Sequence, residues 1–148
     1  MAILNATVLT VLLSLPLPAT APIEKAFLQN SADALAEVLT SRGGIPVSLP
    51  EPLSLADVLS PDQAYLVFRR VFAIFKTTEF FVTPGLATLP GRPGGILRAR
   101  WSFRSEKTGR TIPVRIFFYL SPEPRGRGAG PTDGRGVLRV VEIRGERL

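Results

Sequence analysis

The first half of the chain spaces its apolar side chains for helices. Between residues 23 and 39 they recur on one helical face, and Gly43 and Gly44 follow as a stop signal. Asn30 and Ser31 interrupt this run, because asparagine tolerates a left-handed backbone and serine caps a new helix. The pattern therefore predicts two short helices, followed by an extended segment at residues 45–49.

The clearest helix start in the chain lies at residues 60–63. Ser60 is a typical N-cap, Pro61 suits the first helical position, and Gln63 completes a capping box. From there to about Lys76 the apolar residues form one wide stripe, which favours a helix lying on a sheet. We expect this helix to belong to the core.

After this helix the apolar period falls to two, which is typical of strands. Four strands are predicted near residues 79–88, 96–105, 111–121 and 137–144. Helices gathered on one side of a sheet, without alternating strand and helix units, indicate an α+β fold. The expected architecture is a cone: a curved antiparallel sheet of four to five strands packed on two to three N-terminal helices.

The two middle strands are predicted to form a hairpin with a two-residue loop at Thr108 and Gly109. That register sets Trp101 opposite Ile116 and gives the hairpin an apolar face and a cationic face. The apolar face would carry Leu97, Ala99, Trp101, Phe103, Val114, Ile116, Phe118 and Leu120. The cationic face would carry Arg98, Arg100, Arg104, Arg115, Phe117 and Tyr119.

Three stretches of the chain together resemble a known bacterial family. They are Asn-Ser-Ala-Asp-Ala-Leu-Ala at 30–36, Leu-Ser-Pro-Asp-Gln-Ala at 59–64 and Val-Val-Glu-Ile-Arg at 140–144. The family is an exported domain of unknown function with the nuclear-transport-factor-two-like, or cystatin-like, fold. The resemblance implies that fold and export, and it implies no reaction. The long loop and the arginine content of this chain depart from the family.

The N-terminus has the features of a targeting segment. Residues 1–21 carry no charged side chain, residues 6–17 are mostly apolar, and Ala19-Thr20-Ala21 offers a small-x-small cleavage pattern. We predict a signal peptide at 1–21 and one domain over 22–148, with a flexible loop rich in proline, glycine and arginine at 122–136. The protein would be periplasmic or secreted and have no transmembrane segment after cleavage; a mis-assigned start codon would leave it cytoplasmic.

The chain has no cysteine and no histidine. It therefore lacks disulfides, thiolate metal sites, the commonest transition-metal ligand and the usual general base. We expect no catalytic residues, no metal and no cofactor.

Positive charge gathers in the last third of the chain. Of 18 basic and 12 acidic residues, 12 basic and 5 acidic ones lie in residues 96–148. Such asymmetry favours an anionic partner. The candidate binding residues are those that combine arginine with an aromatic ring on the cationic hairpin face: Arg98, Arg100, Arg115 and Tyr119. Export argues against nucleic acid, which leaves an anionic envelope component or a small ligand.

Three functional classes remain open at this point. The first choice is a non-catalytic binding or accessory module that uses a cone pocket or the basic sheet face. An isomerase- or dehydratase-like pocket enzyme would instead use Asp57, Glu79 or Tyr65. A structural protein would form a homodimer through Phe117 and Tyr119.

Overall fold

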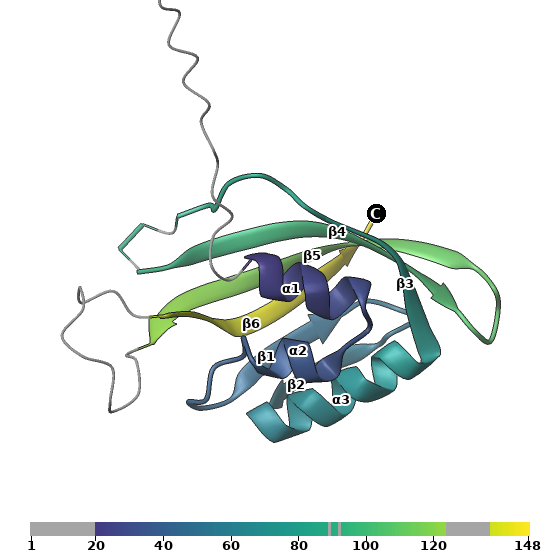
Figure 1. Cartoon of the computed structure of the whole chain (residues 1–148), viewed down its shortest axis with the longest axis horizontal. Coiled ribbons are helices and arrows are strands. Elements are labelled where there is room, and N and C mark those ends of the chain that lie inside the picture. The colour runs from purple at the N-terminus through teal and green to yellow at the C-terminus, as the bar shows by residue number, and fades with distance from the viewer. Residues whose placement is uncertain (1–19, 89, 92, 124–136) are drawn as a thin grey trace, which may run out of the picture.

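The computed structural model describes residues 20–88, 90–91, 93–123 and 137–148, which form three helices and six strands (Figure 1). The helices are α1 (Thr20–Leu28), α2 (Ala32–Ala36) and α3 (Pro61–Ile74). The strands are β1 (Ile45–Leu49), β2 (Leu55–Leu59), β3 (Phe75–Val82), β4 (Gly95–Ser105), β5 (Thr111–Glu123) and β6 (Val137–Arg147). All three helices lie on the same side of the curved sheet.

The helix boundaries follow the capping signals of the sequence. Asn30 adopts a left-handed φ of 50°, and the Ser31 side chain accepts a hydrogen bond from the Ala34 amide to start α2. At α3, the capping box between Ser60 and Gln63 is formed in both directions. The predicted break between α1 and α2 and the predicted start of α3 are confirmed.

The sheet has one strand more than the upper limit of the prediction and is not purely antiparallel. Its order is β2-β1-β6-β5-β4-β3, and β1 runs parallel to β6 through Val47 opposite Ile143 and Ser48 opposite Arg144. The strand missing from the prediction is β2. Its three middle residues, 56–58, are exposed, so an alternation of buried and exposed positions cannot be read from its sequence.

The β4–β5 hairpin keeps the predicted faces in a different register. Trp101 stands opposite Val114, two residues away from the predicted partner Ile116. The reason is a four-residue loop at 106–109, closed by a 3.0 Å hydrogen bond from the Ser105 amide to the Arg110 carbonyl. Because side chains alternate with period two, a slip of two residues leaves every side chain on its predicted face.

Strand β3 begins directly after α3, at Phe75, four residues before the predicted start. Its register against β4 shifts between Thr77 and Glu79, and regular pairing ends at Val82. Beyond that point an isolated bridge joins Ala87 to Ile96, close to the predicted end of the strand. The apolar alternation at residues 79–88 therefore spans two separate pairings with β4, the regular one that ends at Val82 and the bridge at Ala87.

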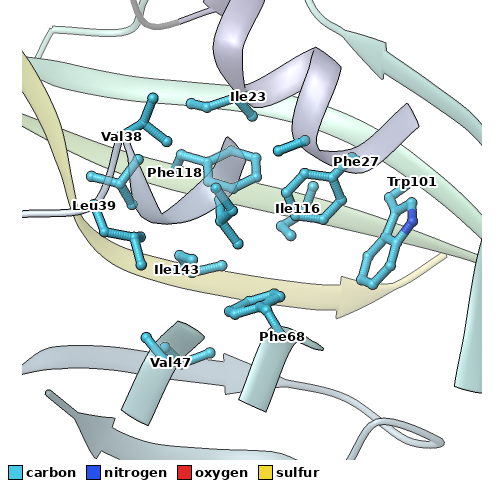
Figure 2. Packing of buried hydrophobic residues seen from close by; sticks show 14 of the residues in the cluster. Ile23, Phe27, Val38, Leu39, Val47, Phe68, Trp101, Ile116, Phe118 and Ile143 are labelled. Atoms are coloured by element: carbon cyan, nitrogen blue, oxygen red, sulfur yellow. The ribbon is translucent and has the colours of Figure 1, made fainter. Parts of the chain in front are cut away.

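The core lies between the helices and the sheet, and aromatic rings fill it (Figure 2). Phe27 of α1 stacks on Phe80 with ring centroids 4.7 Å apart and meets Trp101 and Phe118 edge-on at 5.0 and 5.5 Å. The Trp101 indole donates a 2.9 Å hydrogen bond to Thr77, so its polar atom has a partner. Side chains thus occupy the space between α1 and the sheet.

Two segments with predicted roles lie mostly outside the described residues. Of the predicted signal peptide only Thr20 and Ala21 are described, and they form the first residues of α1. Of the predicted loop at 122–136, Pro122 and Glu123 belong to β5, where Glu123 pairs with Val137; residues 124–136 lie outside. Within the described ranges, none of the helices has the length and apolarity needed to cross a membrane.

Candidate functional site

The sheet face turned away from the helices, here called the outer face, gathers the candidate binding residues. Successive side chains of a strand point to opposite faces of the sheet. A residue that follows or precedes one buried against the helices therefore points to the outer face. The prediction for the hairpin is confirmed: the two faces separate as expected, and the arginines of the outer face are exposed while the aromatic rings beside them are half-buried. The binding residues predicted from sequence therefore share one surface.

The centre of the outer face is a row of three side chains across three strands. Phe117 of β5 stands opposite Arg98 of β4 on one side and Arg144 of β6 on the other. The row continues into β1, where Ser48 stands beside Arg144. Since strands lie about 4.8 Å apart, the two arginine backbones are about 10 Å apart with the phenyl ring between them.

The neighbouring row places like charges side by side. Arg100 stands directly opposite Arg115, and Arg115 stands opposite Glu146. The Arg115 and Glu146 side chains approach to 3.8 Å, with both more than half exposed. An exposed pair of this kind contributes little stability, and like charges directly opposite each other are unfavourable.

On its other side, the central row adjoins an ordered cluster around Tyr119. The Arg144 Nε donates a 2.5 Å hydrogen bond to Glu142 on the same strand, and the guanidinium lies 5.5 Å from the centre of the Tyr119 ring. The hydrogen bond to Glu142 and the charge of that carboxylate raise the pKa of Arg144 above its ordinary value. Arg144 is thus a cation with one edge of its guanidinium bonded to a carboxylate and an aromatic ring nearby.

Two surface hollows lie on either side of the central row and share Arg98 and Phe117. The first, called the tyrosine hollow, has a volume of about 510 Å³ and includes Tyr119, Arg144 and Glu146 in its lining. The second, called the double-arginine hollow, has a volume of about 460 Å³ and includes Arg100, Arg115 and Leu148. Both volumes lie within the usual range of small-ligand sites.

Two of the four arginines around these hollows have no acidic partner among the described residues. Carboxylates within 4 Å are present for Arg115 and Arg144, whereas none is present for Arg98 or Arg100. Four arginines and two glutamates give the cluster a surplus of positive charge. What the arrangement offers chemically is a set of guanidinium donors beside aromatic rings, which suits anions.

Sequence reasoning missed Arg144 and Glu146. It predicted the strand that carries Arg144 but had no register for it, because residues 124–136 separate β5 from β6. Glu142 pairs with Arg144 on the same strand. The available signal was the spacing of Glu142, Arg144 and Glu146, which puts all three on one face of a strand.

The residues proposed for a pocket enzyme do not lie together. Asp57 is exposed on β2 and Glu79 is exposed on β3, which are the two opposite edges of the sheet. Tyr65 is half-buried on α3 and lines a separate hollow with Arg69 and Lys76. No cluster of acidic side chains in the described part of the chain has a geometry that could hold a metal ion.

Comparison with solved structures identifies the fold. A ketosteroid isomerase-like protein of Erwinia carotovora atroseptica matches with a TM-score of 0.61 at 16% identity, over 88% of this chain and 91% of the other. An NTF2-like protein of unknown function in nutrient uptake from Rhodospirillum rubrum matches at 0.58 and 13%, over 88% and 95%. A DUF4783 family protein of Bacteroides ovatus matches at 0.55 and 12%, over 86% and 94%.

These likenesses show an NTF2-like α+β fold, as the sequence resemblance implied, and at such low identity they show the fold alone. The neighbours include domains of unknown function, in line with the same resemblance. No protein-family model and no curated protein matches the sequence.

Proposed function

We propose that the protein is an exported, non-catalytic binding module that holds an anionic ligand on the outer face of its sheet. The observation that carries the proposal is the central row, in which Arg98 and Arg144 flank Phe117 from neighbouring strands. The paired strands fix the spacing of the backbone positions that carry these groups, and the Arg144 side chain also contacts Glu142 and Tyr119. A site that is ordered before binding loses less entropy when the ligand arrives.

Because the core is filled, the outer face is a better candidate for the binding site than a pocket inside the cone. Phe27, Phe118 and Trp101 are fully buried between α1 and the sheet, which is where a cone pocket would lie. The tyrosine and double-arginine hollows instead lie on the outer face, around the cationic side chains. Charge complementarity therefore directs an anion to the outer face.

Retention on heparin tests this proposal with variants of equal net charge. Replacing Arg98 and Arg144 with glutamine should lower the salt concentration that elutes the protein, because both cations of the central row are lost. Replacing Arg69 and Arg70 of α3 with glutamine removes the same charge from the helix side and should change elution much less. Equal shifts for the two double variants would mean that net charge alone drives retention and would contradict the proposal.

A second candidate function is homodimerisation through the same face. The observation that favours it is a pair of large apolar side chains near Arg100 that are more than half exposed: Phe81 stands opposite Arg100, and Leu148 lines the same hollow as Arg100. Apolar side chains exposed together often mark an interface between protein chains. Phe117, proposed from the sequence as part of the dimer surface together with Tyr119, lines the same hollow as Leu148.

A further inference from the structure

The tyrosine hollow brings three kinds of side chain into one small space. Arg98 and Arg144 can only donate hydrogen bonds, whereas an ionised Glu146 can only accept them. Phe117 and Tyr119 add half-buried aromatic rings. A ligand that satisfies all of them needs an anionic group, a hydroxyl donor and an apolar face.

We infer that the ligand is a polysaccharide of uronate sugars, an inference that rests on the proposed function. Each unit of such a chain carries a carboxylate, several hydroxyl groups and a face of C–H bonds. The carboxylate suits the planar guanidinium of Arg98 or Arg144, a hydroxyl group can donate to Glu146, and the C–H face can pack on an aromatic ring.

The acidic side chains of the face favour a sugar over a nucleic acid. Glu146 is exposed in the tyrosine hollow, and its contact with Arg115 is 3.8 Å, too long for a hydrogen bond. The backbone of single-stranded DNA offers phosphate acceptors and no donors, so it would leave Glu146 beside like charge. A uronate chain gives the same carboxylate a hydroxyl partner.

The double-arginine hollow extends the site to a second sugar unit. Arg98 and Phe117 line both hollows, so a chain leaving the tyrosine hollow enters the other directly. Arg98 and Arg100 are two residues apart on β4, or about 7 Å along the strand, so they suit separate carboxylates. A carboxylate near Arg100 and Arg115 would also offset the repulsion between these opposed cations.

Calorimetric titration with galacturonate and with tetragalacturonate tests the two-hollow site. The tetramer should bind at least about tenfold more tightly than the monomer, because a second contact within one ligand costs little further entropy. Replacing Arg100 and Arg115 with glutamine should abolish this gain with chain length. The Arg69 and Arg70 double variant, which removes the same charge from α3, should retain it. Equal affinities of monomer and tetramer for the wild-type protein would overturn the inference.

The Glu146→Leu variant removes both the charge and the hydrogen-bond acceptor, and it separates sugar recognition from simple attraction of charge. It should weaken tetragalacturonate binding by about two- to tenfold, the range expected for one lost hydrogen bond. The same change should strengthen binding of oligo-deoxythymidylate, because it removes a repelling charge. Stronger binding of both ligands would show that the face responds to charge alone and would refute the uronate inference.

The controls also separate this inference from the proposed function. If oligo-deoxythymidylate binds the wild-type protein more tightly than tetragalacturonate does, and the Arg98 and Arg144 double variant loses that binding, the anion-binding function stands and the uronate inference falls. If neither probe binds the wild-type protein, the proposed function itself fails.

Discussion

At the scale of single residues, Phe27 has the densest aromatic surroundings of any side chain described. Its ring contacts those of Phe68, Phe72, Phe80, Trp101 and Phe118, with centroids between 4.7 and 6.3 Å away. One side chain thus joins α1 to α3 and to the strands β3, β4 and β5. Figure 2 shows its ring among those of Phe68, Trp101 and Phe118. Close-packed interiors relax little around a missing ring, so the loss of Phe27 would leave a cavity.

Substituting Phe27 tests this role against a matched phenylalanine. Phe27→Ala should lower the free energy of unfolding by about 3–5 kcal/mol, the usual loss for a fully buried ring. Phe81→Ala, at a residue that is 61% exposed, should change the free energy of unfolding by less than about 1 kcal/mol. Urea denaturation followed by circular dichroism measures both. Similar losses at the two positions would contradict the assigned core.

At the scale of elements, Asn30 controls how α1 turns into α2. Its φ of 50° reverses the chain between the two helices, and its side chain accepts a 2.9 Å hydrogen bond from the Thr77 amide of β3. The residue therefore has two roles. It adopts a left-handed backbone conformation, which glycine can also adopt, and its side chain accepts a hydrogen bond, which glycine cannot do. The hydrogen bond ties the corner between the helices to an edge strand of the sheet.

Two substitutions separate these roles. Asn30→Gly should lower the free energy of unfolding by about 1 kcal/mol, the typical value of one hydrogen bond. Asn30→Ala should cost about 1–2 kcal/mol more, because alanine disfavours the left-handed conformation. Thermal or urea denaturation of both variants gives the difference. If alanine costs no more than glycine, the left-handed backbone at Asn30 is not required.

At the scale of the whole molecule, the outer face combines exposed apolar side chains with opposed cations. Two copies meeting through this face would bury Phe81 and Leu148 but bring the arginines of each copy near those of the other. Salt shortens the range of that repulsion from about 10 Å at 0.1 M to about 3 Å at 1 M and leaves apolar burial in place. Any dimer formed through this face should therefore be favoured by salt.

Light scattering after gel filtration tests the dimer. The dimer fraction should rise between 0.1 and 1 M salt, the range over which screening changes most. Phe81→Ser combined with Leu148→Ser should give monomers at every salt concentration. Leu66→Ser on α3, where the leucine is equally exposed at 53%, should have no effect. A dimer fraction that falls with salt would rule out association through this face.

Local patterns in the sequence predicted the helices and the two faces of the hairpin, because both depend on a few neighbouring residues. The capping box at Ser60 and the alternation from Leu97 to Phe103 are signals of this kind. The exact hairpin register depended on the loop, and a four-residue loop replaced the expected two. Burial determined only which residues face the core, because a slip of one residue would turn every side chain to the other face, and this part of the prediction was correct.

The features that could not be predicted from the sequence depend on pairings between strands far apart in the chain. Val47 of β1 meets Ile143 of β6 across 96 residues, and no local pattern indicates that contact. Arg144 joins Arg98 and Phe117 only through this assembly of β6 beside β5. The arginines of the hairpin were therefore predictable members of the site, whereas Arg144 and Glu146 were not.

The parallel pairing of β1 with β6 has a consequence for how the chain is made. The hydrogen bonds of Val140 with Val38 and Thr40, and the pairing of Val47 with Ile143, need residues that are synthesised about 100 residues after those of β1. Until those residues emerge, β1 and β2 have no central strand to join, and one edge of β5 lacks its hydrogen-bonded neighbour. The sheet can therefore be completed only after β6 has been made, and until then the partly folded chain exposes apolar surface that a chaperone can bind.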